Sequence, residues 1–219
     1  MKCDVSDQES VKQAFKWVED NLGGVDILVN NAGVYKWEKF CKIINYSFSF
    51  INVIKRFISI FNDDENTNDE LKKIIDINVM GMVYCARAAF NSMNKRNGYG
   101  YIININSITG HSVPFPTADV SSYNIYAGSK YAVTATTEVM RQEITCLNNK
   151  KIRVGSLSPG EVRTDMMEVS GFEGNVDEYF EITPALSPFD ISQGVIYMLS
   201  TPVNVQVAEL TLRPVGERA

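Results

Sequence analysis

Hydrophobic positions along the chain follow two spacings, one typical of helices and one typical of buried strands. Apolar residues recur at helical intervals from Val11 to Leu22 and again from Leu71 to Met93. Short apolar runs of strand length separate such stretches, and they are Val25–Val29, Tyr101–Ile105 and Ile152–Leu157. A strand that is apolar on both sides suits a parallel sheet covered by helices on both faces. The pattern therefore predicts an α/β fold with a doubly wound parallel sheet.

Cap and turn residues indicate where several of these elements begin and end. Ser6 and Glu9 form a capping-box pattern at the start of the first helix, and Gly23 follows its last turn. Later segments predict a helix over 122–147, a helix over 191–199 and a strand over 205–212. Polar or turn residues stand directly after three strands, and they are Asn30, Ser107 and Pro159–Gly160. Function in such sheets collects at the carboxyl ends of strands, so we expect the site there.

Residues 35–61 depart from this rhythm, because they are rich in Phe, Ile, Lys, Asn and Tyr and contain no Gly or Pro. AT-rich codons encode those residues, so our leading hypothesis is a translated intron or a gene-model error. The alternative is a genuine insertion that forms an amphipathic lid or a membrane-surface helix. A membrane-spanning helix is not expected, because Lys55 and Arg56 interrupt a short apolar run. We therefore expect one domain over 1–219, with 35–61 as an atypical insertion.

The overall composition narrows the possible partners. The net charge of −5 argues against nucleic acid or an anionic membrane as a main partner. The four cysteines lack paired or metal-type spacing, which suits reduced thiols in the cytoplasm, and the first residues do not resemble a signal peptide. The single histidine, His111, lies in a proline-rich loop. We therefore expect neither a Ser-His-Asp triad nor a metal site.

Tyr126 and Lys130 form the most informative pair of residues in the chain. At positions i and i+4 of a predicted helix they share one face. A cation beside the phenol favours the phenolate and lowers the tyrosine pKa. A tyrosine that titrates near the working pH can serve as a general acid or base. The pair therefore predicts proton-transfer chemistry at the start of this helix.

Five motifs stand in order on their expected elements: Asn30-Asn31-Ala32-Gly33, Asn78-Val79-Met80-Gly81, Ser107-Ile108-Thr109-Gly110, Tyr126-Ala127-Gly128-Ser129-Lys130 and Pro159-Gly160-Glu161-Val162-Arg163-Thr164. This arrangement resembles the short-chain dehydrogenase/reductase family and covers nearly the whole chain outside 35–61. The resemblance implies a Rossmann-like sheet and an NAD(P)-dependent enzyme that interconverts an alcohol and a carbonyl by hydride transfer.

The resemblance also implies a catalytic set of Asn78, Ser107, Tyr126 and Lys130. Tyr126 would exchange a proton with the substrate oxygen, and Ser107 would orient the same oxygen by a hydrogen bond. Lys130 would tune Tyr126 and hold the nicotinamide ribose. Asn78 would hold a water between Lys130 and solvent. The alternative for Asn78 is a polar side chain that satisfies backbone groups inside a bent helix.

By the same resemblance, the cofactor is NADP, with NAD left open. The residues that would bind it are Asp4 and Val5 at the adenine, Asn30 and Gly33 at the adenosine ribose, and Tyr126, Lys130, Pro159, Gly160, Val162 and Thr164 at the nicotinamide end. Asp4 has an alternative role as a carboxylate at the positive end of a helix dipole. One departure from the family is Asn106, which stands where a second serine is usual.

The family's glycine-rich dinucleotide loop has no counterpart in this sequence. We therefore expect a sheet that lacks the family's first strands, with an open edge at Val25–Val29. The loop is where the pyrophosphate meets a helix N-terminus, so we expect weak cofactor binding. An alternative to the active enzyme is thus a truncated, non-catalytic remnant that cannot hold the cofactor.

Within the family, four stretches resemble the insect farnesol dehydrogenase-like group, namely 74–81, the loop 111–122, 126–135 and the tail 210–216. The resemblance implies a small apolar alcohol or carbonyl as substrate, a cytoplasmic location and a homo-oligomer in the full-length form. The loop between Glu161 and Pro188 carries apolar side chains suited to such a substrate, namely Met166, Met167, Phe172, Tyr179 and Phe180. The alternative is that these are ordinary anchors of a surface loop. A further possibility is a membrane-associated form anchored by residues 35–61.

Overall fold

Parallel strands form one sheet in the order β1-β2-β3-β4. The structure is a computed structural model that describes residues 1–36, 60, 65–115, 123–172 and 174–217. The strands are β1 (Ile27–Asn30), β2 (Gly100–Ile105), β3 (Ile152–Pro159) and β4 (Glu209–Leu212). Parallel neighbours in chain order require a crossover between each pair, so the predicted α/β organisation is confirmed. The predicted insertion lies almost entirely outside the described residues.

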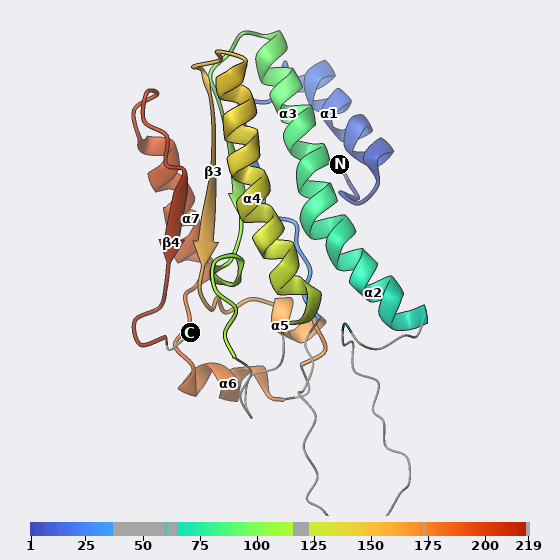
Figure 1. Cartoon of the computed structure of the whole chain (residues 1–219), viewed down its shortest axis with the longest axis vertical. Helices are drawn as coiled ribbons and strands as arrows, with labels where there is room; N and C mark the ends of the chain where they lie inside the picture. Colours follow the sequence, from blue (N-terminus) through green and yellow to red (C-terminus); the bar gives the residue numbers. More distant parts are fainter. Residues whose placement is uncertain (37–59, 61–64, 116–122, 173, 218–219) are drawn as a thin grey trace, which may run out of the picture.

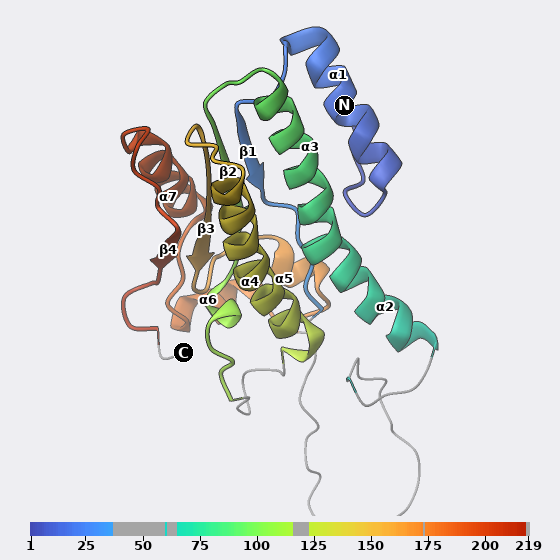
Figure 2. The same cartoon turned by 45° about the horizontal axis from the view of Figure 1, so that its top comes forward.

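Helices cover the sheet from both sides. They are α1 (Gln8–Leu22), α2 (Glu65–Ile75), α3 (Met82–Lys95), α4 (Asn124–Cys146), α5 (Met166–Val169), α6 (Val176–Ile182) and α7 (Pro188–Ser200). Figure 1 shows α3 and α4 side by side in front of the strands, with α1 beyond α3. In Figures 1 and 2, α5 and α6 lie at the end of the sheet where the strand arrows point.

The alternation of side chains along β2 divides the core into two layers. Ile102 packs with Ala89 and Met93 of α3 on one face. Tyr101 and Ile103 point to the other face, toward α7. Each fully buried side chain of this size contributes about 1.5–3 kcal/mol through removal from water. The apolar run of β2 is therefore explained by helices on both of its faces.

β1 is covered on one face only within the described residues. Leu28 packs into the layer beneath α3. Ile27 and Val29 point the other way, and they are 52% and 37% exposed. β1 also pairs with β2 alone among the described strands, as expected for an open edge. The prediction that this strand is buried on both faces is thus wrong for the described part of the molecule.

The first helix begins one residue later than its capping-box pattern predicts. The N-cap is Asp7, whose carboxylate accepts a hydrogen bond of 2.9 Å from the Glu9 N–H. The Ser6 hydroxyl instead donates to Asp4 at 2.7 Å. The predicted end is confirmed, since Gly23 adopts a left-handed conformation with φ 80°.

The long helix predicted from Leu71 to Met93 is interrupted by a π-helical turn. This turn spans Asp76–Gly81 and joins α2 to α3 without a break in the chain direction. A π turn widens the helix locally and redirects the side chains on it. Gly81 lies in close contact with the N-terminal segment, because a Cβ there would meet the Val5 side chain at 2.8 Å.

Candidate active site

A pocket of about 1610 Å³ opens at the carboxyl ends of the strands. Its walls come from the segment after β1, the turn after β2, the first turns of α4 and the segment from β3 to α7. The predicted site residues that line it are Gly33, Ser107, Tyr126, Lys130, Pro159, Gly160, Val162 and Thr164. Four others, Asp4, Val5, Asn30 and Asn78, lie outside its lining. Parallel strands bring these distant segments to one edge, as the sequence predicts.

Ser107 and Tyr126 meet on the pocket wall. Ser107 follows β2 and caps a short 3-10 turn, Ile108–Gly110, where its oxygen accepts hydrogen bonds from the Thr109 N–H at 3.1 Å and from the Thr109 hydroxyl at 2.9 Å. The Ser107 hydroxyl also interacts with the Tyr126 phenol in the sense that lowers the pKa of Tyr126. Both of these acceptor contacts come from Thr109, which leaves the Ser107 proton available to a partner on the pocket wall.

The turn that carries Ser107 packs tightly on α4. A Cβ at Gly110 would lie 2.7 Å from the Lys130 carbonyl oxygen and 2.8 Å from Asn106 Nδ2. Asn106 Nδ2 donates to Thr134 at 2.8 Å, and the Thr134 hydroxyl donates to the Gly110 carbonyl at 2.9 Å. Only glycine permits this approach of turn and helix, which fixes Ser107 relative to Tyr126.

Lys130 is buried one turn after Tyr126 on α4. Its ammonium donates to the Ile105 carbonyl at 3.0 Å and lies 5.7 Å from the centre of the Tyr126 ring. Burial lowers the pKa of Lys130 to about 8. The Lys130 side chain therefore lies near Tyr126, while the Ile105 carbonyl accepts a hydrogen bond from its ammonium group.

The predicted lowering of the Tyr126 pKa by Lys130 is wrong for this structure. Burial raises the pKa of Tyr126 above its ordinary value, and the hydrogen bond from Ser107 opposes that shift. Lys130 does not offset the burial, because its ammonium points to the Ile105 carbonyl. The phenol is therefore protonated at neutral pH here, which is the form that can donate a proton.

Asn78 lies on the π turn and uses its side chain to join three segments. Its Oδ1 accepts from the Val34 N–H at 2.8 Å, and its Nδ2 donates to the Val34 carbonyl at 2.9 Å and to Ser129 at 3.1 Å. Ser129 in turn donates to the Tyr126 carbonyl at 2.7 Å. This matches the alternative of a polar side chain that satisfies backbone groups. The role of Asn78 in holding a water stays a prediction.

Two predicted cofactor contacts point away from the pocket. Asn30 Nδ2 donates to Asn104 at 2.8 Å beneath α3 and α4, whereas its neighbour Asn31 lines the pocket. The Asp4 carboxylate accepts hydrogen bonds from the Ser6 N–H and hydroxyl, which lower the pKa of Asp4. The helix-start role considered for Asp4 belongs to Asp7. Adenine contacts of Asp4 and Val5 stay predictions.

Sequence reasoning missed several residues of the pocket lining. Tyr35 packs edge-on against Tyr126, with ring centres 5.0 Å apart, and lies 6.3 Å from the ring of Tyr123. Glu161 and Glu217 also line the pocket. Glu161 stands inside the Pro159–Thr164 motif and so could have been found, but nothing in the sequence near Glu217 signals a site. Of the predicted apolar loop residues, the pocket is lined by Met166, Met167, Phe172 and Tyr179.

His111 contacts a serine and a glutamate, but the geometry is not that of a catalytic triad. Its Nε2 lies 2.9 Å from Ser158 Oγ and 3.5 Å from a carboxylate oxygen of Glu209. A triad needs the two partners on different ring nitrogens. Within the described ranges, no cluster of at least three His, Cys, Asp or Glu residues could hold a metal ion. Among the described helices, none combines the length and hydropathy needed to cross a bilayer.

Known proteins resemble this chain along most of its length. Farnesol dehydrogenase from Aedes aegypti is 42% identical over 218 residues, which are 100% of this chain and 75% of that protein. Dehydrogenase/reductase SDR family member 11 from Mus musculus is 33% identical over 216 residues, which cover 97% of this chain and 72% of that protein.

Solved structures resemble the fold. The closed form of serine dehydrogenase complexed with NADP+ has a TM-score of 0.79 at 25% identity, covering 100% of this chain and 77% of its own. Alcohol dehydrogenase from the archaeon Thermococcus sibiricus complexed with 5-hydroxy-NADP has a TM-score of 0.70 at 25% identity. The match covers 99% of this chain and 74% of that one.

A family model described as short chain dehydrogenase matches residues 1–172. The match includes the turn with Ser107 and the helix with Tyr126 and Lys130, which the structure brings together on one pocket wall. The chain therefore belongs to the short-chain dehydrogenase family of NAD(P)-dependent oxidoreductases.

Proposed function

We propose that this protein interconverts an alcohol and a carbonyl compound with NADP, and that Tyr126 is its general acid and base. The observation that carries the proposal is that Ser107 and Tyr126 line one pocket wall together, with Lys130 one helical turn away. A positioned proton donor beside an orienting hydroxyl is what a carbonyl oxygen needs as charge develops on it.

In the direction of reduction, the Tyr126 hydroxyl donates its proton to the carbonyl oxygen. Burial keeps the phenol protonated for this step. The Ser107 hydroxyl, whose oxygen already accepts from Thr109, turns its proton to the same carbonyl oxygen. In the direction of oxidation, Tyr126 accepts the proton of the alcohol.

The residues of the pocket fit the nicotinamide end of the cofactor. Its volume exceeds the roughly 300–1,000 Å³ of sites for one small ligand, so a substrate and part of a dinucleotide have room together. Gly33, Gly160 and Thr164 line the same pocket as Tyr126. When bound, NADP supplies or takes the hydride. The choice of NADP draws on the NADP-bound structure neighbours.

For the substrate, we propose an alcohol with an apolar chain, such as farnesol. The support is the farnesol dehydrogenase relative together with the apolar side chains on the pocket wall. Met166, Met167 and Phe172 lie there beside the aromatic rings of Tyr35 and Tyr179. An assay of farnesol oxidation, monitored by the formation of NADPH, tests this substrate directly.

The test of the chemistry is the Tyr126→Phe variant. We expect kcat to fall about 10²–10⁴-fold, because the variant lacks the proton that is transferred. Thermal unfolding with NADPH and with NADH measures cofactor binding separately. A cofactor at about one hundred times its dissociation constant adds roughly 2.7 kcal/mol of stability. No shift with either cofactor would contradict the proposal and favour the non-catalytic alternative.

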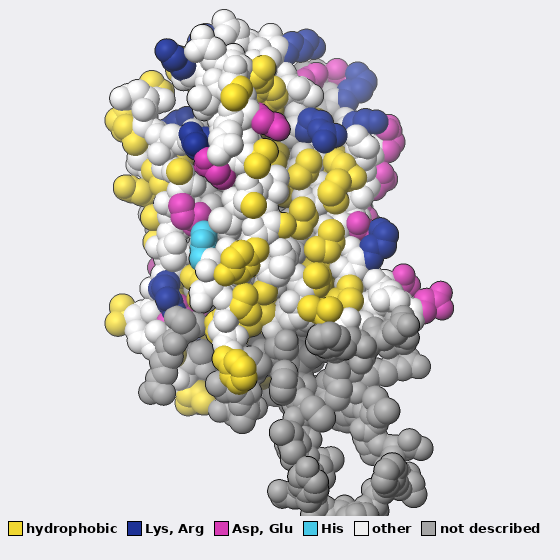
Figure 3. All heavy atoms as spheres, in the orientation of Figure 1, with side chains coloured by type: hydrophobic (Ala, Val, Ile, Leu, Met, Phe, Trp, Pro, Cys, Tyr) yellow, Lys and Arg dark blue, Asp and Glu magenta, His cyan; other side chains and the backbone are white. Residues whose placement is uncertain are grey.

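We also propose that the protein forms a homo-oligomer in the cytoplasm, through the face formed by α3 and α4. Figure 3 shows apolar side chains gathered over these two helices. Tyr131 and Val139, two turns apart on α4, are 44% and 49% exposed. Exposed apolar stripes of this kind support association. Light scattering of the protein and of Val139→Lys tests the proposal, with a monomeric variant expected.

A further inference from the structure

Glu161 is an acidic side chain of the pocket wall whose carboxylate is not engaged by the protein. It is the second residue after β3, and its backbone N–H donates to Glu217 Oε1 at 2.8 Å. No hydrogen bond or ion pair joins the Glu161 carboxylate to another residue in the part of the chain that the structure describes. A half-buried carboxylate without a partner is costly, so it calls for a ligand group.

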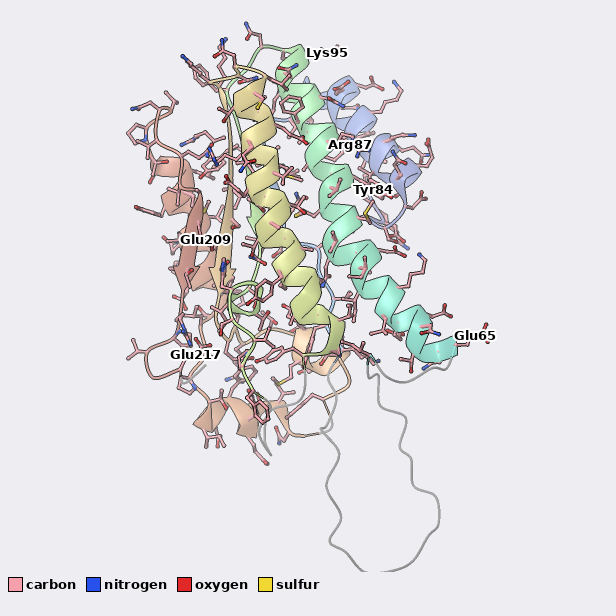
Figure 4. All side chains as sticks on the ribbon, in the orientation of Figure 1. Glu65, Tyr84, Arg87, Lys95, Glu209 and Glu217 are labelled. Atoms are coloured by element: carbon pink, nitrogen blue, oxygen red, sulfur yellow. The ribbon has the colours of Figure 1, made fainter. Side chains whose placement is uncertain are left out.

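Glu217 fixes the position of Glu161 and shows that the two acids have different tasks. Its Oε1 accepts from Glu161 and its Oε2 accepts from Arg213 Nε at 2.6 Å, so both oxygens are occupied. The contact is close, since a Cβ at Gly160 would lie 2.5 Å from the Glu217 carboxylate. Figure 4 shows Glu217 near the end of the chain, on the side where α6 lies. Glu217 is therefore structural, and Glu161 is left to face the pocket.

The charges on the pocket wall favour one class of ligand. Three acidic side chains line it, Glu161, Glu178 and Glu217, against the one cation Lys130 among the described lining residues. Lys130 is already engaged by the Ile105 carbonyl. Because Glu217 is paired with Arg213, the acids left for a ligand are Glu161 and Glu178. A hydroxyl or ammonium group of the substrate would be attracted to them, whereas a carboxylate would be repelled.

One further observation agrees with a ligand that donates hydrogen bonds. Burial and the charge of Glu217 raise the pKa of Glu161 to about 7, as expected for an acid held without a compensating partner. The wall thus contains an acceptor that the fold itself does not satisfy.

We propose that Glu161 binds a second hydrogen-bond-donating group of the substrate, so that the preferred substrates carry a hydroxyl or amine beside the reacting carbon in addition to an apolar chain. This rests on the proposed function and narrows it. The apolar lining then holds the chain, and Glu161 selects the polar end. A site built to bind such a group discriminates strongly against an analogue that lacks it.

The experiment compares four substrates of equal chain length: a six-carbon secondary alcohol, its vicinal diol, its vicinal amino alcohol and the corresponding 2-hydroxy acid. Each is assayed with wild type, Glu161→Gln, Glu161→Ala and the control Glu181→Gln, which alters an exposed acid of α6 outside the pocket lining. We expect wild type to prefer the diol and amino alcohol. We expect Glu161→Ala to lose about tenfold or more in kcat/KM on these two and about twofold or less on the plain alcohol.

Equal losses on all substrates, or a wild type without preference for the second donor, would overturn the proposal. If wild type oxidises no alcohol at all, the proposed function fails first. The inference is then decided by thermal stabilisation with the diol and the plain alcohol, without turnover. A larger shift with the diol that disappears in Glu161→Gln supports a donor-binding site, and equal shifts refute it.

Discussion

The two walls of the pocket differ in how their polar groups are used. On the wall of Ser107 and Lys130, these two groups have partners in the protein: the Ser107 oxygen accepts from Thr109, and the Lys130 ammonium donates to the Ile105 carbonyl. On the facing segment after β3, the Glu161 carboxylate has none among the described residues. The difference separates two tasks, because proton transfer needs fixed geometry, whereas recognition needs acceptors left open for the ligand.

After Tyr126→Phe, the largest expected effect comes from breaking the fixed wall with Ser107→Ala. The variant loses the hydroxyl that faces the substrate oxygen, and we expect kcat to fall about 10²–10³-fold. It also loses the cap of the 3-10 turn, which costs about 1 kcal/mol of stability. Steady-state kinetics measures the fall in kcat, and urea unfolding measures the loss of stability. A variant with wild-type kcat would show that this wall does not act on the substrate.

A smaller effect is expected on the wall of Glu161, where a substitution should raise the stability of the protein and not lower it. With the Glu161 pKa raised from 4.5 to about 7, the folded protein keeps a proton that the unfolded chain releases as pH rises through this window. Stability therefore falls between about pH 4.5 and 7 by at most about 3 kcal/mol, and the loss is complete above pH 7. Glu161→Gln removes this loss, so its advantage over wild type grows with pH in urea unfolding. Curves for the two proteins that stay parallel across the window would contradict the assignment.

The smallest effect tests how closely the fixed wall is packed. Gly110→Ala places a methyl group against the Lys130 carbonyl and the Asn106 amide, and we expect a loss of about 1–3 kcal/mol with reduced activity. The matched control is Gly128→Ala on α4, where a Cβ would meet only Ile125 at 3.6 Å. That variant should gain about 0.5–1 kcal/mol, because alanine favours a helix over glycine. A Gly110→Ala variant with wild-type stability and activity would mean that the 3-10 turn can move away from α4.

The sequence predicted the parts of the site that depend on local structure. Spacing places Tyr126 and Lys130 on one helix face and Ser107 at the end of a strand, and the family resemblance implied that the three form one site. Glu217 could not be found in this way, because it reaches Glu161 only when the chain returns after β4. The pKa of Tyr126 was predicted in the wrong direction, since burial is a property of the tertiary structure.

The fold shows the same division between local and distant information. The strands and most helices follow from periodicity, but the uncovered face of Ile27 and Val29 depends on which elements pack there. The cap of α1 is Asp7 and not Ser6, whose hydroxyl donates to Asp4. Apolar patterns predict which residues are suited to burial, and tertiary packing decides whether they are buried.

The π turn at Asp76–Gly81 has a consequence for insertions and deletions in this chain. Each residue of a regular helix turns the chain by about 100°. Deleting one residue between α2 and α3 would restore a regular helix but rotate Asn78 away from Val34 and Ser129. A single-residue gap here would therefore detach the exit of β1 from the helix of Tyr126, so the length of this stretch, and not only its composition, is part of what specifies the site.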